Sequence, residues 1–293
     1  MKEGRIIKAV SGFYYVQTDE GVYACKGRGV FRKKAITPLV GDHVTFDITG
    51  DKEGYITKIH KRLNMLTRPP IANVHQAVLV SSAKEPDFSP LLLDRFLVVL
   101  ESHQIKPIIF ITKIDLLSEK ERDTISEYAQ EYEHIGYDVH LVDASAGSDL
   151  SHLEHIFANK VSVIAGQSGV GKSSLLNALN LSLVMETDVI SKRLGRGKHT
   201  TRNVELVEIG EGLVADTPGF SSVDFNHIEE EALSECFPEI NEVGHACKFR
   251  GCLHDKEPAC AVKAAVEAGP ITPFRYNHYL RFLEEIQSRK PRY

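Results

Sequence analysis

The chain has 293 residues and a formal net charge of −5, with 42% hydrophobic and 26% charged residues. This composition is ordinary for a folded protein and excludes wholesale disorder, and the length suits about two domains of roughly 150 residues each. No apolar run is long enough to span a bilayer or to form the core of a signal peptide, so we expect a cytoplasmic protein that does not bind membranes.

Charge is distributed unevenly along the chain. Residues 1–68 carry 13 basic and 7 acidic side chains, which gives this segment a net charge of +6. Residues 69–222 carry 13 basic and 21 acidic side chains, and residues 223–293 carry 9 and 12. A basic N-terminal segment on an acidic body predicts that this end of the protein meets a polyanion.

The pattern of the first segment predicts a small β barrel. Residues 4–62 contain five strand patterns separated by turns with glycine, at Arg5–Val10, Phe13–Thr18, Val22–Lys26, Asp42–Thr49 and Tyr55–His60. Five strands in about 60 residues are typical of an OB or SH3-like barrel. Basic clusters at residues 28–34 and 58–62 stand beside Phe31 and His60, which suits an oligonucleotide ligand. A β module whose basic face meets only solvent is the alternative.

The pattern changes near residue 68. The paired prolines of Thr67–Pro70 predict an extended linker. Beyond them, apolar runs alternate with helical patterns, which predicts a parallel sheet covered by helices on both faces. Strands are expected at Ala77–Ser81, Pro107–Thr112, Val139–Val142, Val161–Ala165, Val204–Ile209 and Leu213–Ala215. Helices are expected at Leu91–Ser102, Glu119–Glu133, Leu150–Asn159 and Ser173–Leu181.

The last part of the chain has a different composition. From about residue 223 it is rich in Cys and His, and it ends in an amphipathic helical pattern near Tyr276–Ile286. We therefore expect three domains: an RNA-binding OB fold at residues 1–68, an α/β core at residues 69–222, and a mostly helical domain at residues 223–293.

The most specific motif is Gly166-Gln-Ser-Gly-Val-Gly-Lys-Ser173, which matches the P-loop pattern G-x-x-x-x-G-K-[ST] between a predicted strand and a predicted helix. Its glycines allow backbone N–H groups to face a phosphate, and the helix N-terminus adds positive potential. Lys172 is expected to reach the β- and γ-phosphates during catalysis, and Ser173 to bind Mg²⁺. The residues expected at the nucleotide are Gly166, Gln167, Ser168, Gly169, Val170, Gly171, Lys172, Ser173 and Ser174.

Two further motifs follow predicted strands. In Asp216-Thr-Pro-Gly219, Asp216 is expected to hold Mg²⁺ through water, and the Gly219 N–H is expected to meet the γ-phosphate. The second motif resembles the [NT]-K-x-D guanine motif and consists of Thr112, Lys113, Ile114 and Asp115. The Asp115 carboxylate can accept from both guanine edge donors, a pair that adenine lacks. Considered alone, Asp115 could instead be a helix cap.

The order of these motifs is unusual for a GTPase. The guanine motif begins at residue 112 and the P-loop at residue 166, whereas GTPases usually place the guanine motif last. A sheet of strand–helix units can be opened at a new point without disturbing its site, so we interpret the chain as a circularly permuted GTPase cut after residue 219. A guanine-supporting loop is expected within Val142–Ala146, at either Asp143-Ala144 or Ser145-Ala146.

A basic loop, Lys192–Arg202, lies where switch I is expected. A Thr hydroxyl there would complete the Mg²⁺ shell; Thr200 and Thr201 are both candidates, and we favour Thr201. Phe220 stands where Ras-like enzymes carry the Gln that orients water, so unassisted hydrolysis is expected to be slow. His199 is the candidate for positioning that water, with a solvent-facing loop residue as the alternative.

Four metal-binding side chains lie within fourteen residues: Cys247, Cys252, His254 and Cys260. A Cys₃His set without a carboxylate suits one structural Zn²⁺. An Fe–S cluster and ordinary buried thiols are the alternatives. His245 is a possible substitute ligand with less suitable spacing. Cys25 and Cys236 lie outside the cluster and are expected to be packing residues.

Together, these motifs resemble one family, the ribosome small-subunit-dependent GTPases (the RsgA, or YjeQ/YloQ, family). The resemblance spans essentially the whole chain and rests on Arg68-Pro69, Leu93–Arg95, Thr112–Asp115, Gly166–Ser173, Gly197–Thr201, Asp216–Phe220 and the Cys₃His set. It implies an OB fold, a permuted GTPase core and a zinc domain. It further implies GTP hydrolysis to GDP in late maturation of the 30S subunit, contacts with 16S rRNA, and stimulation by the subunit. Asp143 departs from the Ser expected in the guanine-supporting loop.

We expect the protein to be a monomer. Two other functions must be weighed against GTP hydrolysis. A P-loop kinase or ATPase would prefer ATP and need an acceptor pocket, and the Thr112–Asp115 motif argues against it. An RNA-binding scaffold with a vestigial nucleotide site is the other candidate. The intact Lys172, Ser173 and Asp216 argue against that scaffold.

Overall fold

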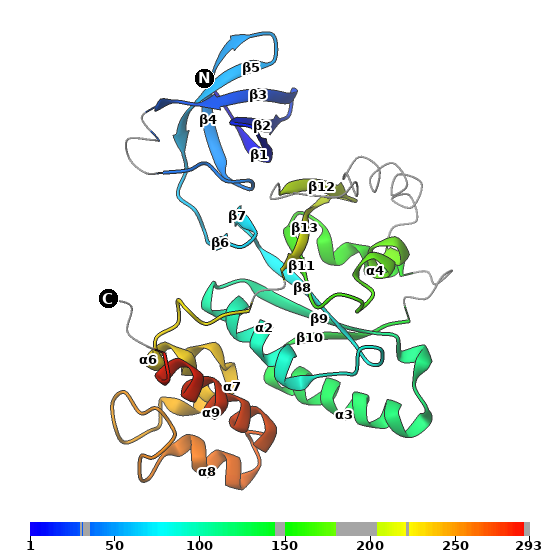
Figure 1. Ribbon diagram of the computed structural model, residues 1–293, viewed down its shortest axis with the longest axis vertical. Helices are drawn as coiled ribbons and strands as arrows, with labels where there is room; N and C mark the ends of the chain where they lie inside the picture. The colour runs from blue at the N-terminus through cyan, green and yellow to red at the C-terminus, as the bar shows by residue number, and fades with distance from the viewer. Residues whose placement is uncertain (30, 32–35, 144–149, 180–203, 221–222, 290–293) are drawn as a thin grey trace. The chain divides into compact units, whose positions relative to one another are not determined.

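The structure is a computed structural model that describes residues 1–29, 31, 36–143, 150–179, 204–220 and 223–289 (Figure 1). The chain forms two compact units, each assembled from segments far apart in sequence. The first unit contains Met1–Val80 and Asp143–Ser221, and the second contains Ser81–Val142 and Ser222–Tyr293. The three consecutive domains expected from the sequence, with boundaries at residues 68 and 222, remain a prediction. Among the described residues, no helix combines the length and apolarity needed to cross a bilayer.

The first unit begins with an OB-fold barrel of five strands, β1 to β5. They are Lys2–Val10, Phe13–Thr18, Gly21–Gly27, His43–Gly50 and Glu53–Ile59. The order is β1-β2-β3-β5-β4, and pairing of β1 with β4 closes the barrel. Apolar side chains alternate inward along the strands, and those of Ile6, Val16, Val44, Phe46 and Ile56 are fully buried. The predicted strands and barrel are confirmed.

A short hairpin replaces the extended linker predicted at residues 67–70. Strands β6 (Met65–Thr67) and β7 (Pro70–Ala72) pair antiparallel, with Arg68 and Pro69 in the turn. The prediction was wrong because the residues on either side of the prolines are apolar and pair with one another: Leu66 is opposite Ile71, and both are buried. The hairpin also pairs with the loop before β4, since the N–H of Ala72 donates to the carbonyl oxygen of Val40 at 2.9 Å.

The first unit continues with the strands that carry the P-loop. Strand β11 (Val161–Ala165) pairs in parallel with β8 (Gln76–Ser82) on one side and β13 (Gly212–Phe220) on the other. Strand β12 (Glu205–Ile209) is antiparallel to β13 because only two residues join them in a tight hairpin. The expectation of a parallel strand at this point was therefore wrong.

The barrel is paired with this sheet within the first unit. Lys8 of β1 lies opposite Glu205 of β12, and their side chains form an ion pair of 2.8 Å. Gln17 of β2 donates to Glu208 at 2.6 Å. Strand pairing and polar contacts thus connect the barrel to the strand that precedes the Asp216–Gly219 motif.

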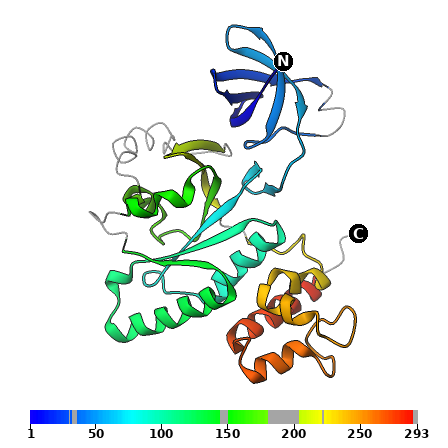
Figure 2. The same cartoon turned by 180° about the vertical axis from the view of Figure 1, so that it is seen from behind.

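The second unit contains the remaining core strands and the C-terminal helices (Figures 1 and 2). Strands β9 (Lys106–Thr112) and β10 (Asp138–Leu141) are parallel, and helices α2 (Pro90–Ser102) and α3 (Glu119–Ile135) accompany them. The C-terminal part consists of α6 (Glu230–Leu233), the 3₁₀ turn η3 (Ser234–Cys236), α7 (Pro238–Gly244), α8 (Ala261–Ala268) and α9 (Pro273–Gln287). The predicted strands and helices of this unit, including the C-terminal amphipathic helix, are confirmed.

A buried ion cluster fastens α9 to α2 inside the second unit. Arg275 is fully buried and donates to Asp94 at 2.5 Å and to Glu239 at 2.7 Å. His278 donates from Nδ1 to the other oxygen of Asp94 at 2.5 Å, and Tyr132 donates its hydroxyl to Asp94 at 2.7 Å. Because the cluster joins four helices through charge-assisted hydrogen bonds, it fixes the C-terminal helices against α2.

Candidate nucleotide and metal sites

The P-loop follows the fully buried strand β11 and turns back on three glycines. Gly166, Gly169 and Gly171 have φ angles of +135°, +83° and +89°, a region that side chains rarely adopt. A Cβ on Gly166 would also lie 2.2 Å from the carbonyl oxygen of Val80. Only glycine fits at residue 166, since the loop passes against the backbone of the neighbouring strand.

Lys172 begins helix α4 (Lys172–Leu179) and reaches back across the loop. Its Nζ donates to the carbonyl oxygens of Gly166, at 2.9 Å, and Gln167. Burial lowers the pKa of Lys172. Ser173 and Ser174 are exposed at the start of the helix. The ammonium group, the hydroxyl groups and the helix N-terminus therefore lie on one short segment, which is the chemistry that a polyphosphate requires.

The Asp216–Gly219 motif lies inside strand β13 rather than after a strand that ends at Ala215. Strand β13 is parallel to β11, and Phe220 is opposite Ala165, the residue immediately before the P-loop. The carboxyl ends of these two adjacent parallel strands therefore carry both phosphate motifs. This edge is where open α/β sheets bind ligands. The side chains of residues 216–220 are outside the described part of the structure, so their roles remain predictions.

The guanine motif lies in the second unit, at the end of β9. Thr112 is buried, and its hydroxyl donates to the carbonyl oxygen of Ser81 at 3.2 Å. Lys113 adopts a left-handed conformation with φ of +61°, and its Nζ donates to the carbonyl oxygen of Glu85. Asp115 is exposed and has no hydrogen bond or ion pair within the described ranges. Its carboxylate is therefore available to a ligand.

The helix that follows the motif has its own cap. Ser118 accepts from the N–H of Glu121, and the Glu121 carboxylate accepts from the N–H of Ser118, which makes a capping box. The Ser118 hydrogen bonds, together with Lys84, lower the pKa of Glu121 to about 2. Asp115 is three residues ahead of this cap, so the alternative interpretation of Asp115 as a helix cap is not supported.

Several predicted site residues lie outside the described part of the chain. These residues are His199, Thr200 and Thr201 of the basic loop and Ala144–Ala146 of the guanine-supporting loop. Asp143 is described, but the register of that loop stays open. The region expected to form a helix at residues 150–159 instead contains the 3₁₀ helix η2 (Ser151–Phe157).

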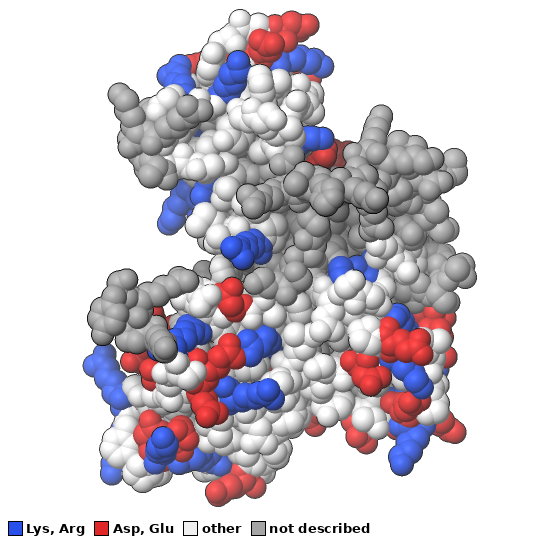
Figure 3. Space-filling model, viewed as in Figure 1, with Lys and Arg blue, Asp and Glu red and all other residues white. Residues whose placement is uncertain are grey.

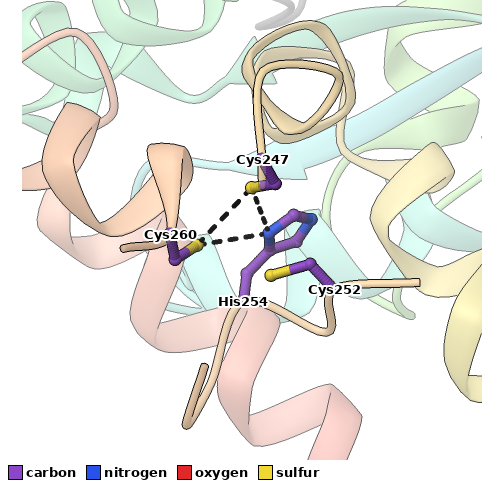
Figure 4. Close-up of side chains that lie close together, drawn as sticks. All are labelled: Cys247, Cys252, His254 and Cys260. Atoms are coloured by element: carbon purple, nitrogen blue, oxygen red, sulfur yellow. Dashed lines mark hydrogen bonds between the residues drawn. The ribbon is translucent and has the colours of Figure 1, made fainter. Parts of the chain in front are cut away.

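The Cys₃His set converges on one point (Figure 4). The sulfur of Cys247 lies 3.8 Å from the sulfur of Cys260 and 3.5 Å from His254 Nδ1, and Cys260 lies 3.4 Å from the same nitrogen. All four ligand atoms, including that of Cys252, are within 4.8 Å of one another. Tetrahedral zinc with bonds of about 2.3 Å to sulfur and 2.0–2.1 Å to nitrogen requires S···S and S···N separations of about 3.8 and 3.5 Å. The four residues fit that geometry, and His245 is not among them.

Hydrogen bonds from residues outside the Cys₃His set fix the loop around His254. Glu257 accepts from the N–H groups of Leu253 and Asp255, at 2.8 and 3.0 Å. Tyr276 of α9 donates to the carbonyl oxygen of His254 at 2.6 Å, and Tyr279 donates to that of Leu253 at 2.7 Å. These hydrogen bonds fix the backbone of the loop that carries His254. The sequence spacing of Glu257, Tyr276 and Tyr279 contains no signal that predicts this role.

The expected basic face of the barrel is partly neutralised by internal ion pairs. Arg62 donates to the fully buried Asp42 at 2.7 Å, and Arg28 pairs with Asp47 at 2.7 Å. Arg62 therefore has a structural role. Lys26, Lys58 and Lys61 make no ion pair with any described residue, and on the face shown in Figure 3 basic and acidic side chains are interspersed.

Comparison with known proteins gives consistent matches over the whole chain. A family model for the RsgA GTPase matches residues 59–226, and one for the RsgA N-terminal domain matches residues 3–56. The small ribosomal subunit biogenesis GTPase RsgA 2 of Oceanobacillus iheyensis is 64% identical over 293 residues, 100% of both chains. The small ribosomal subunit biogenesis GTPase RsgA of Bacillus anthracis is 59% identical over the same length, again 100% of both chains.

Two solved structures resemble this one. YloQ, described as a circularly permuted GTPase, has a TM-score of 0.86 and 53% identity, and the match covers 100% of this chain and 97% of that one. YjeQ from Thermotoga maritima has a TM-score of 0.85 and 34% identity, with 99% of each chain covered.

Proposed function

Because the chain belongs to the RsgA GTPase family, we propose that it hydrolyses GTP to GDP and phosphate in late biogenesis of the small ribosomal subunit. Its relatives are named for that process, and the match extends over their full length. The observation that carries the proposal is the glycine loop with positive φ angles that leads into Lys172, beside the strand that contains Asp216. We further propose that the protein acts as a monomer in the cytoplasm.

The phosphates of GTP are held by the P-loop in this proposal. Backbone N–H groups of residues 166–174 and the ammonium group of Lys172 contact the phosphate oxygens. The exposed hydroxyl of Ser173 fits a Mg²⁺ ligand, and Asp216 and Thr201 are the further candidates to hold the ion. An ion held by these residues would neutralise charge on the β- and γ-phosphates. Lys172 exchanges its two backbone carbonyl acceptors for charged phosphate oxygens, which form stronger hydrogen bonds.

Guanine selection is assigned to Asp115. Its exposed carboxylate accepts from the N1–H and N2–H₂ groups of guanine, and the Lys113 stem covers the base. The second unit positions these residues through buried Thr112 and the left-handed backbone of Lys113. Adenine lacks the donor pair, so an ATP-dependent kinase or ATPase is disfavoured.

Hydrolysis depends on a partner in this proposal. Phe220 cannot orient water, so the unassisted rate is low, and His199 and the subunit together position the nucleophile. The barrel contacts 16S rRNA through Lys26, Lys58 and Lys61, which form no ion pair with a described residue. His199→Ala should lose the stimulated rate while it retains GTP affinity. If the subunit still stimulates that variant fully, another group positions the attacking water.

The Cys₃His cluster holds one structural Zn²⁺ per chain. The separations of its ligand atoms match a closed tetrahedral site, and a closed site does not activate substrate. Zinc then stabilises the C-terminal helices, whose core is small.

The nucleotide assignment is tested by Asp115→Asn. This change exchanges an acceptor for a donor, which matches xanthine better than guanine. GTP affinity should therefore fall at least about tenfold while XTP becomes usable, measured by equilibrium binding of fluorescent nucleotides. Asp123→Asn, an exposed site on α3, is the matched control. If Asp115→Asn binds GTP as tightly as the parent does, the guanine site lies elsewhere.

A further inference from the structure

A short loop at the end of strand β8 holds the start of the guanine motif. We call residues 82–86 the anchor loop. The N–H of Ala83 donates to the carbonyl oxygen of Thr112 at 2.9 Å. The carbonyl oxygen of Glu85 accepts a hydrogen bond from Lys113 Nζ. The anchor loop therefore fixes both the end of strand β9 and the side chain of Lys113.

The same loop also holds the segment that follows the guanine motif. Lys84 Nζ donates to both carboxylate oxygens of Glu121, at 2.9 and 3.2 Å. Glu121 in turn accepts from the N–H and the hydroxyl of Ser118, at 2.8 and 2.7 Å. The hydrogen bonds from Ser118 and Lys84 lower the pKa of Glu121 to about 2, so this carboxylate is fully charged at neutral pH. Lys84 is thereby connected to the cap of α3.

Side-chain hydroxyl groups hold the anchor loop in its conformation. Ser82 is buried, and its hydroxyl lies 2.8 Å from the carbonyl oxygen of Lys84 and 2.5 Å from that of Pro86, where it can donate to either. The hydroxyl of Thr112 donates to the carbonyl oxygen of Ser81 at 3.2 Å. The anchor loop is therefore closed on itself and attached to strand β9 by side chains as well as by backbone.

Asp115 lies between the two anchored ends, in the 3₁₀ turn η1 (Ile114–Leu116). Arg122 of α3 donates to the carbonyl oxygen of Ile114 at 3.1 Å, which adds a further contact to this turn. The carboxylate of Asp115 itself meets no hydrogen-bonding or charged partner among the residues that the structure describes. The backbone of the turn therefore sets where this carboxylate lies.

Guanine recognition makes a strict demand on that position. In the function proposed above, one carboxylate accepts from the N1–H and N2–H₂ groups of guanine at the same time. Hydrogen bonds weaken steeply when the angle at the hydrogen falls below about 120°, and a binding side chain must be held to within about 0.5 Å. If the turn shifts, one of the two hydrogen bonds is lost. Guanine then loses its advantage over hypoxanthine, the base that lacks the 2-amino group.

We propose that Lys84 and Glu121 are positioning residues for guanine recognition, which hold the turn of Asp115 so that its carboxylate meets both guanine donors together. This inference rests on the guanine site proposed above. The two side chains are 35% and 45% exposed, and an ion pair this exposed contributes little to folding stability. Removing the pair should therefore change nucleotide specificity without unfolding the protein.

The test compares GTP with ITP, whose base is hypoxanthine, on the full-length, zinc-loaded protein. Competition with a fluorescent nucleotide gives both affinities, and the parent should bind GTP at least about tenfold more tightly than ITP. Lys84→Met and Glu121→Gln should each lower this ratio at least about threefold through weaker GTP binding, with little change for ITP. The Gln variant keeps an acceptor for the capping box, so it removes the ion pair alone. A merely structural role would weaken both nucleotides equally.

Three further variants sharpen the result. Lys84→Arg should restore the parent ratio, because its guanidinium group can pair with the same carboxylate. The double variant Lys84→Met with Glu121→Gln should lower the ratio no more than either single change, since both act through one contact. Lys120→Met is the matched control, an exposed cation in the first turn of α3 that forms no ion pair with a described residue, and it should leave the ratio unchanged.

Asp115→Ala separates this proposal from the guanine assignment. If Asp115→Ala abolishes the preference for GTP while Lys84→Met and Glu121→Gln lower the ratio less than threefold, the guanine site stands and the positioning role is wrong. An equal loss of GTP and ITP affinity in the Lys84 and Glu121 variants would also overturn the positioning role. If the parent binds GTP and ITP equally, both proposals are wrong.

Discussion

Replacing Arg275 by Met tests the connection between α9 and the core of the second unit. Methionine retains apolar contact with the ring of Phe237, which lies 4.5 Å from the guanidinium carbon. It removes the hydrogen bonds to Asp94 and Glu239, and it leaves two carboxylates without their cation. Asp94 is fully buried, and the Glu239 side chain is only 10% exposed, so water can hydrate neither carboxylate well.

The expected loss of folding stability follows from the burial of Asp94 and Glu239. Breaking one side of a buried ion pair costs about 3–5 kcal/mol, because a buried charge is left uncompensated. For a unit of this size, each kcal/mol of lost stability lowers the midpoint of thermal unfolding by about 2–4 °C. The midpoint should therefore fall by about 10 °C. Adding Glu239→Gln should recover part of the loss, since it removes one of the two stranded charges.

Differential scanning calorimetry of the zinc-loaded protein measures this shift. Arg281→Met on the exposed face of α9 is the matched control and should change stability by no more than about 0.5 kcal/mol. If Arg275→Met unfolds within 2–3 °C of the parent, then the cluster does not fasten α9 to α2, and the structural role assigned to Asp94 is wrong.

Two further predictions concern the cysteines. A thiol-modifying reagent should release about one zinc per chain and remove hydrogen-exchange protection from α7 and α8, because the ligands cannot hold that loop alone; absence of zinc, or a brown iron protein, would contradict the assignment. Cys236, whose pKa burial and nearby carboxylates raise to about 12, is a protonated thiol at pH 8 and should react with iodoacetamide far more slowly in the native protein than in urea. Mass spectrometry of timed samples measures that ratio, and equal rates would show that Cys236 is accessible.

Much of the fold followed from local patterns. Alternating burial in β1 to β5 and continuous apolar runs in β9 and β11 are signals that strand prediction uses directly. Two errors have a shared cause, since in each case the pairing of two short strands across a tight turn decided the outcome. The Leu66–Ile71 pair folds the proline segment into a hairpin, and the two-residue turn after Ile209 forces β12 antiparallel.

The candidate sites differ in how far they could be predicted from the sequence. The P-loop, the guanine motif and the Cys₃His set each lie within a short stretch of sequence, so their spacing alone could predict them. Asp94 and Arg275 lie 181 positions apart, and their charges give no indication of their pairing until α2 and α9 pack.

The central claim is that this chain is a GTPase whose turnover depends on the small ribosomal subunit. The most direct measurement is phosphate release from GTP and from ATP by the purified protein, with and without 30S subunits, and with Lys172→Ala as the inactive control. We expect slow GTP hydrolysis by the protein alone, at least about tenfold stimulation by the subunit, and little hydrolysis of ATP in either case. An equal rate with ATP, no response to the subunit, or full activity of Lys172→Ala would contradict it.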